Sequence, residues 1–312
     1  MRQIILCISI LFLLTGFKTL AQDNFSVITK VVDGYPMLSP DGRKIVFTSN
    51  RTGTYQIYLC DSDGSNIVQL TNSIGSNASP VWSPDGSKIV FASERDNDSE
   101  IYIMNTNGTE QKRLTDQPGD DSHPKFSPDG KRIIFNSPRT SPDLSISWTS
   151  QFIEVFTMDI EGNDLKQITF LKSVCTYPSF SPDGSKIVFR QLIKDSGLNW
   201  SLDSINFNSE VYVMNSDGSN PMNISNSKAF DGWPFWMPDS KTIVFTSNRG
   251  QIENMGQLYS VNPDGSNLNR LTDTNNSFIQ ASVSKDGKTI LAQRNWETET
   301  YEYGHIVTIK IE

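Results

Sequence analysis

The chain repeats, with small changes, the segment Trp82-Ser83-Pro84-Asp85-Gly86-Ser87-Lys88-Ile89-Val90-Phe91. Six copies of its turn occur, at residues 39–42, 83–86, 127–130, 181–184, 237–240 and 284–287, and the first four read Ser-Pro-Asp-Gly without change. Successive turns begin 44, 44, 54, 56 and 47 residues apart. A four-stranded blade of a propeller repeats at this period, so the sequence predicts an all-β, six-bladed β-propeller.

The second repeat, residues 79–115, shows which strands and turns make up one repeat. A short inner strand at 80–82 leads into the turn, and apolar strands follow at 88–93 and 100–104. Proline presets φ, aspartate bonds its own backbone and glycine accepts a positive φ, so the turn favours a tight hairpin. Asn107-Gly108 is a second hairpin signal before an outer strand at 111–115.

The two ends of the chain predict how the ring closes. Five outer strands end in an aliphatic residue followed by Thr or Ser, at residues 70–71, 114–115, 168–169, 224–225 and 271–272. The last repeat stops after its third strand, residues 305–311, and residues 25–31 carry the same signature in Ile28-Thr29. We expect residues 25–31 to close the last blade by pairing with the C-terminal strands, which removes exposed sheet edges.

The N-terminus has the pattern of a secretory signal peptide. It has a basic start at Arg2, an apolar run at residues 4–14, and small residues at Thr19 and Ala21. We expect cleavage after Ala21, with residues 1–21 as the signal peptide and residues 22–312 as the propeller domain. No later segment has the roughly 20 apolar residues of a transmembrane helix. The mature chain is therefore expected to be periplasmic or secreted, without a transmembrane segment.

The net charge argues against nucleic acids and anionic membranes as partners, and the positions of the cysteines argue against a disulfide. The formal charge of −8 becomes −10 when Arg2 and Lys18 leave with the signal peptide. Nucleic acids and anionic membranes require a basic surface, so neither is expected as a partner. Cys60 and Cys175 fall in the first and fourth repeats, on opposite sides of a six-membered ring, so no disulfide is expected between them.

The repeat resembles that of the TolB propeller family. The resemblance rests on residues 82–91, on residues 100–104 (Glu-Ile-Tyr-Ile-Met) and on Leu114-Thr115, and similar segments cover essentially the whole mature chain. TolB is the periplasmic component of the Tol-Pal envelope system of Gram-negative bacteria. The resemblance implies a periplasmic propeller of WD-like repeats that binds an envelope protein or peptide, such as a peptidoglycan-associated lipoprotein. TolB has an α/β domain before its propeller, which this chain is expected to lack, so contacts with the inner-membrane Tol proteins are not implied.

The same repeat also resembles the propellers of prolyl oligopeptidase-like enzymes and of oligogalacturonate lyases, and the fold does not choose between these roles. The chain has no Gly-x-Ser-x-Gly elbow for a hydrolase. Of its two histidines only His123 falls near the predicted channel, whereas a metal-dependent lyase would need several. We therefore expect a non-catalytic protein that binds a protein or peptide of the cell envelope. The alternative is a carbohydrate-binding or polysaccharide-lyase-like propeller that acts on acidic oligosaccharides.

The binding site is predicted on the upper face, which is the side of the ring opposite the six repeated turns. The longest loops, at residues 138–151, 191–209 and 295–304, join second and third strands there, as binding loops of repeat proteins commonly do. The residues before the inner strands should surround the channel mouth: Tyr35, Ser79, His123, Tyr177, Trp233 and Gln280. The loops add Trp148, Trp200, Trp296 and Tyr301. Such aromatic side chains suit a peptide, a protein loop or a sugar.

No cofactor is expected. Two groups of residues are candidate ligands of a metal ion. Residues 61–66 resemble the start of a calcium loop, but glutamate is missing from the twelfth position and a hairpin turn explains the segment better. Asp33, Asp121 and Asp231 each precede a proline by three residues. If they point inward together, they would hold a structural cation in the channel.

Four arginines stand four residues after a phenylalanine of the second strand: Arg51, Arg95, Arg139 and Arg249. In two repeats an acid begins the third strand, as in Glu100 and Glu154. We expect Arg95 to pair with Glu100, and Arg139 with Glu154, as structural ties within a blade.

Overall fold

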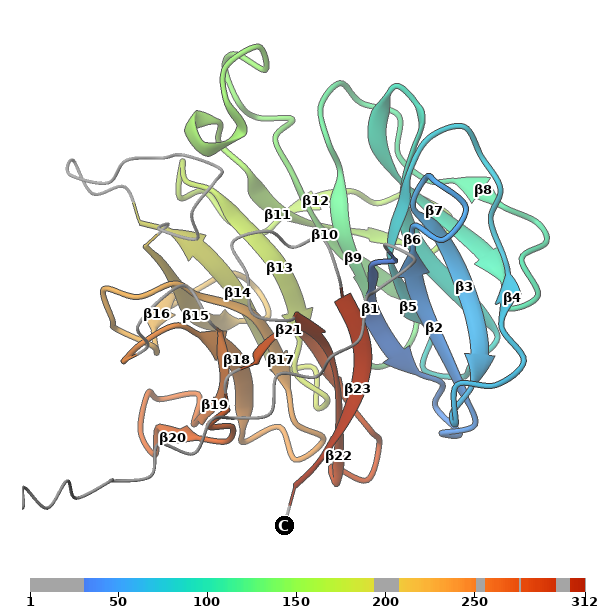
Figure 1. Cartoon of the computed structure of the whole chain (residues 1–312). Helices are drawn as coiled ribbons and strands as arrows, with labels where there is room; N and C mark the ends of the chain where they lie inside the picture. The colour runs from blue at the N-terminus through green and yellow to red at the C-terminus, as the bar shows by residue number, and fades with distance from the viewer. Residues whose placement is uncertain (1–30, 194–207, 251–255, 275, 296–303, 312) are drawn as a thin grey trace, which may run out of the picture. The chain divides into compact units, whose positions relative to one another are not determined.

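The computed structural model describes residues 31–193, 208–250, 256–274, 276–295 and 304–311. Within the compact unit Val31–Glu312, six antiparallel sheets surround a common centre, so the predicted six-bladed propeller is confirmed (Figure 1). In the described ranges the regular structure is β, except for the 3-10 turn η1 (Trp148–Ser150). The described residues contain no candidate for a membrane-spanning helix.

The strands of each blade follow chain order from the centre outward. The first blade contains β1 (Asp33–Leu38), β2 (Lys44–Ser49), β3 (Gln56–Asp61) and β4 (Val68–Gln69). The second contains β5 (Asn77–Trp82), β6 (Lys88–Asp96), β7 (Asp98–Asn105) and β8 (Lys112–Arg113). The third contains β9 (Ser122–Phe126), β10 (Arg132–Ser137), β11 (Glu154–Asp159) and β12 (Lys166–Gln167).

The remaining three blades repeat this arrangement. The fourth contains β13 (Cys175–Phe180), β14 (Lys186–Leu192), β15 (Ser209–Asn215) and β16 (Met222–Asn223). The fifth contains β17 (Asp231–Trp236), β18 (Ile243–Ser247), β19 (Gln257–Val261) and β20 (Asn269–Arg270). In the sixth, the described strands are β21 (Ser277–Val283), β22 (Thr289–Asn295) and β23 (Gly304–Lys310).

The repeated turns form as their residue types predict. In the second blade, the Ser83 hydroxyl donates to the Asp85 carboxylate over 2.5 Å, and the backbone N–H of Gly86, at φ +74°, donates to the Ser83 carbonyl over 2.9 Å. The bond from Ser83 lowers the pKa of Asp85 to about 2. Each turn therefore closes an inner hairpin on the lower face, opposite the predicted site.

The core consists of aromatic and aliphatic side chains between neighbouring blades. Phe135 of β10 is fully buried, and its ring stacks on Phe156 of β11 with centroids 6.0 Å apart. The same pair of positions stacks in the first, fourth and fifth blades at 5.6–6.0 Å. Burial of such a ring contributes roughly 2–3 kcal/mol, and both faces of a blade contribute because neighbours cover each of them.

The first and sixth blades complete the ring in the described residues. Phe47 and Leu291 belong to one buried cluster, and Val32 pairs in parallel with Gly304 (Figure 1). Parallel bridges of the same kind join Ile153 to Val174 and Ser209 to Phe230 between other neighbouring blades. The proposed closing strand at residues 25–31 lies outside the described residues except for its last residue.

The arginine ties exist, but the expected partners were wrong. Arg139 donates to Asp121 at the start of the inner strand over 2.5 Å, and its guanidinium stacks over Phe135 and Phe156. Arg95 donates to Asn77 and Gln111 instead of Glu100. The guanidinium lies over its own blade's stacked rings, which directs it toward the inner strand.

The acids that begin the third strands have other partners. Glu100 accepts from Thr115 and Arg113, and Glu154 accepts from Thr169 and from the backbone N–H of Lys172. These bonds fasten the outer strand to the third strand. Cys60 and Cys175 are buried free thiols, as expected.

We expect Arg139→Met to lower the free energy of unfolding by about 3 kcal/mol, because the nearly fully buried Asp121 would lose its partner. Urea denaturation measures the loss. The control Arg132→Met breaks the ion pair with Asp164, whose side chain is 51% exposed, and should cost less than about 1 kcal/mol. Adding Asp121→Asn to Arg139→Met should recover part of the stability. Equal losses for the two single variants would contradict the assignment.

Candidate functional site

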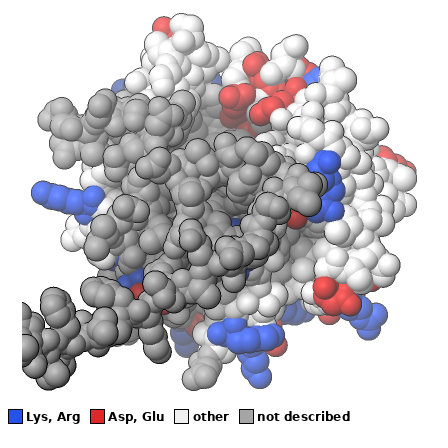
Figure 2. All heavy atoms as spheres, in the orientation of Figure 1, with Lys and Arg blue, Asp and Glu red and all other residues white. Residues whose placement is uncertain are grey.

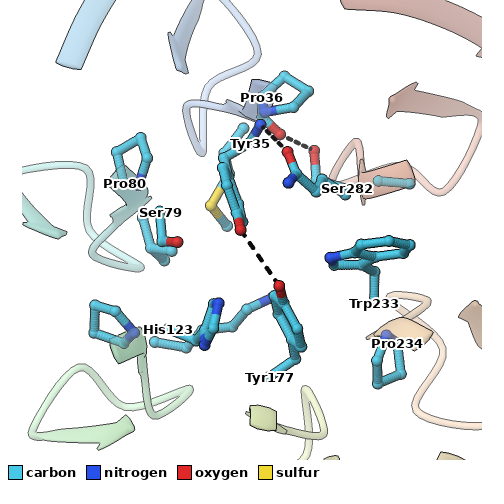
Figure 3. A pocket seen from close by; sticks show the side chains of 15 residues that line it. Tyr35, Pro36, Ser79, Pro80, His123, Tyr177, Trp233, Pro234 and Ser282 are labelled. Atoms are coloured by element: carbon cyan, nitrogen blue, oxygen red, sulfur yellow. Dashed lines mark hydrogen bonds between the residues drawn. The ribbon is translucent and has the colours of Figure 1, made fainter. Parts of the chain in front are cut away.

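The six residues predicted at the channel mouth surround a single cavity of about 70 Å³. Figure 3 shows labelled side chains of the inner strands converging on it. The six residues are Tyr35, Ser79, His123, Tyr177, Trp233 and Gln280. Residues up to 245 positions apart in the chain thus meet at one place, as the bond from the Tyr35 backbone N–H to the Gln280 side chain shows.

An unusual backbone conformation aims these side chains inward. All six have φ between +47° and +55°, and a β-bulge interrupts every inner strand at this position. Proline follows five of the six residues, which suits a bulge because proline cannot donate to the sheet ladder. A positive φ costs a bulky residue of order 1–3 kcal/mol. Because every blade has it, the conformation belongs to the fold, and only the side chains differ.

Aromatic side chains dominate one half of the cavity. The hydroxyl oxygens of Tyr35 and Tyr177 lie 3.4 Å apart (Figure 3). The His123 ring lies 3.8 Å from the Tyr177 ring between centroids, and Trp233 meets Tyr177 edge-on at 6.1 Å. Burial, followed by the neighbouring Tyr177, raises the pKa of Tyr35 well above its ordinary value. The Tyr35 phenol is therefore a neutral hydrogen-bonding group on an apolar wall.

His123 is held neutral in a single tautomer. Its Nδ1 lies 2.9 Å from the Asn136 carbonyl oxygen, while the Asn136 amide donates to the Ser122 hydroxyl over 2.8 Å. This network assigns the proton to Nδ1 and leaves Nε2 as an acceptor. Burial lowers the pKa of His123 to about 3, and the charges of Arg190 and Lys125 act in the same direction.

Two cations at the cavity were not anticipated from the sequence. Lys125 follows Pro124 and lines the cavity, and burial lowers its pKa to about 8. Arg190 of β14 lies behind Tyr177, with its guanidinium carbon 5.0 Å from the ring centroid. A comparison of the repeats at equivalent positions would have found both, because the other blades have neutral residues there.

The remaining predicted residues fall outside the cavity or outside the described chain. Trp148 lies in η1 and is not among the described residues that line the cavity. Trp200, Trp296 and Tyr301 lie outside the described residues. The structure therefore brings together the inner-strand residues and leaves the loop aromatics as expectations.

The three aspartates of the expected cation site have partners within their own blades. Asp33, Asp121 and Asp231 are each ion-paired with an arginine of their own blade, at 2.9, 2.5 and 2.6 Å. A carboxylate engaged in this way is committed to the blade instead of the channel. Within the described ranges, no group of three or more His, Cys, Asp or Glu side chains is placed to hold a metal ion.

Charges of both signs occur on the described surface. Figure 2 shows acidic and basic side chains at separate points of the face in view, without one sign covering it. The cavity differs from this surface, because its described lining has a lysine and no carboxylate.

The comparison with protein families agrees with this architecture. The family model described as the TolB beta propeller domain matches residues 68–145 and 194–307, more than half of the chain. The chain belongs to this family. The family establishes the propeller type, whereas a shared fold does not establish a ligand.

Individual relatives span several functional classes. A putative TolB from Agrobacterium tumefaciens has a TM-score of 0.62 at 21% identity, covering 78% of this chain and 82% of that chain. An oligogalacturonate lyase in complex with manganese has a TM-score of 0.58 at 17% identity, covering 86% and 73%. These two likenesses show the fold alone.

One sequence relative is named as a peptidase. The uncharacterized peptidase YuxL of Bacillus subtilis (strain 168) is 32% identical over 124 residues, which are 40% of this chain and 18% of that protein. The chain spans less than a fifth of the length of the first curated relatives that it matches. The activity of those proteins therefore does not transfer with the match.

We expect His123 to make stability depend on pH between 6.5 and 5. The unfolded chain binds a proton at this residue below about pH 6.5, whereas the folded chain does so only near pH 3, so stability falls as pH falls. The loss reaches about 2 kcal/mol over 1.5 pH units. Urea denaturation of wild type and His123→Gln at pH 7, 6 and 5 measures it, and the difference cancels the contribution of carboxylates. Parallel stability curves for the two proteins would contradict the assignment.

Proposed function

We propose that this protein is an exported, periplasmic TolB-like propeller that binds a protein or peptide of the cell envelope through its upper face. It does so without catalysis. The partner class is an envelope protein of the kind that TolB propellers bind, such as a peptidoglycan-associated lipoprotein. Family membership supports the propeller type, and the signal-like N-terminus supports export.

The observation that carries the proposal is the aromatic cavity at the channel. Tyr35, Tyr177 and Trp233 offer broad, rigid surfaces with polar tips, which bind peptide groups at low cost in side-chain entropy. Their backbone is held by bulges, so the surface is formed before a ligand arrives.

Among the described residues, the contact between Ser122 and His123 is not arranged for hydrolysis. Nδ1 of His123 is engaged by Asn136, so it is not available as a base toward the adjacent Ser122 hydroxyl. No other histidine lines the cavity in the described part of the chain. These features favour binding over peptidase chemistry.

The second candidate is a propeller that binds or cleaves acidic oligosaccharides. Its support is the structural likeness to a manganese-bound oligogalacturonate lyase and the free acceptor at Nε2 of His123. A single imidazole without carboxylates is a weak set of ligands for manganese, which prefers oxygen donors.

The double variant Tyr177→Ala with Trp233→Ala should abolish binding of the peptidoglycan-associated lipoprotein of the source bacterium, because it removes two walls of the cavity. Titration calorimetry measures the affinity. The control, Ile67→Ala with Leu165→Ala, changes two exposed apolar residues of the lower hairpins and should bind like wild type. Unchanged binding by the cavity variant would overturn the proposed site.

For the second candidate, incubation with oligogalacturonate and Mn²⁺ should give no new absorbance from an unsaturated product if the protein is a binder. A product that disappears in His123→Gln would establish a lyase and overturn the non-catalytic proposal. Absence of both product and glycan binding removes this candidate.

A further inference from the structure

Equivalent positions in the six blades can be compared to find charged residues near the channel that the fold does not need. The position held by Arg190 in the second strand of the fourth blade is held in the other blades by Thr48, Ala92, Asn136, Thr246 and Gln293. The second residue after the positive-φ position is Lys125 in the third blade, and Met37, Val81, Ser179, Phe235 and Ser282 in the others. Five blades fold with neutral residues at each position, so the propeller does not need either cation.

Arg190 is a buried cation without a carboxylate partner in the described structure. Its side chain is 7% exposed, and its Nε donates to the Thr176 hydroxyl over 2.9 Å. The guanidinium otherwise lies against the Tyr177 and Phe230 rings at 5.0 and 5.7 Å. Two aromatic faces compensate only part of the cost of removing a guanidinium from water. The arginines of four other blades rest on similar rings, but three of them pair with an aspartate and Arg95 donates to the Asn77 amide oxygen.

Lys125 is a second cation close to His123. It lines the cavity, and both Lys125 and Arg190 act on the His123 ring through their charges. No acidic side chain lines the cavity among the described residues. Because the surroundings have low polarity, two uncompensated positive charges produce a strong local preference for an anion.

The neutral groups of the cavity add hydrogen-bond donors. The indole nitrogen of Trp233 is buried without a partner, and Figure 3 shows it turned toward the middle of the cavity. The phenols of Tyr35 and Tyr177 lie in the same lining, and only one of them can donate to the other. A buried donor without an acceptor is costly until something accepts from it.

We propose that the cavity binds a carboxylate group, held by Lys125, by the donors of Trp233 and the tyrosines, and by the charge of Arg190. This inference rests on the proposed function and names the part of the peptide partner that enters the channel: its C-terminal carboxylate or an acidic side chain. The enclosed space of about 70 Å³ accommodates a carboxylate with a short aliphatic stem. The aromatic walls of Tyr35, Tyr177 and Trp233 suit the peptide group that bears it.

The test uses N-acetyl-trialanine with a free carboxylate and the same peptide as its C-terminal amide. In titration calorimetry the acid should bind the propeller at least tenfold more tightly than the amide. Arg190→Gln and Lys125→Gln should each weaken binding of the acid at least tenfold. The control Arg43→Gln removes a charge whose side chain is 84% exposed in a lower-face turn, and should leave the affinity unchanged.

A measurement without ligand separates a binding role from a structural one. Arg190→Gln should melt at or above the temperature of wild type, because it removes an uncompensated buried charge. It should also raise the pKa of His123 in an NMR titration, because the charge of Arg190 lowers it. A large drop in melting temperature with unchanged peptide binding would make Arg190 structural and overturn its assignment.

The remaining outcomes are also decisive. Equal affinity for acid and amide, or no binding of either, overturns the carboxylate site. Binding of galacturonate without binding of the acidic peptide overturns the peptide ligand and supports the carbohydrate alternative. If the lipoprotein binds but the acid and amide do not differ, only this inference fails. If the acid binds through Arg190 and no envelope protein does, the proposed function fails instead.

Discussion

Each blade of this propeller must bury both faces of its sheet, and neighbouring blades are what cover them. Buried clusters join every pair of adjacent blades, including the sixth and the first through Leu291 and Phe47. No blade could retain its apolar surface alone, since exposing one fully buried phenylalanine costs roughly 2–3 kcal/mol. The closed ring follows from this requirement, and so does the convergence of six inner strands on one channel.

Because neighbouring blades cover one another in the same way, the backbone geometry recurs from blade to blade. The side chains at the channel differ between blades. The inner-strand bulges, the stacked rings and the serine–aspartate turns recur because each blade packs in the same way. The bulges turn one side chain per blade toward the centre without constraining its identity. The cavity can therefore combine Tyr35, His123 and Trp233 while the scaffold stays regular.

Charged groups near the centre divide into two classes by their partners. Asp121 and Asp231 are paired with arginines that lie over their own blades' aromatic rings, so these charges stabilise blades. Lys125 and Arg190 have no carboxylate partner in the described residues and act on the cavity. A residue that differs from those at equivalent positions in the other blades is thus more informative about function than a residue that all blades share.

The sequence by itself determined the number and order of the blades, because turn residues and apolar strands act locally. It also indicated the ring of six channel residues, since their place relative to each turn is the same in every repeat. Only the tertiary structure decided that Arg139 pairs with Asp121 instead of Glu154, because the stacked rings beneath the guanidinium direct it. Tertiary structure likewise placed Arg190 behind Tyr177 and Lys125 in the lining, since charge partners depend on contacts between strands and blades that are distant along the chain.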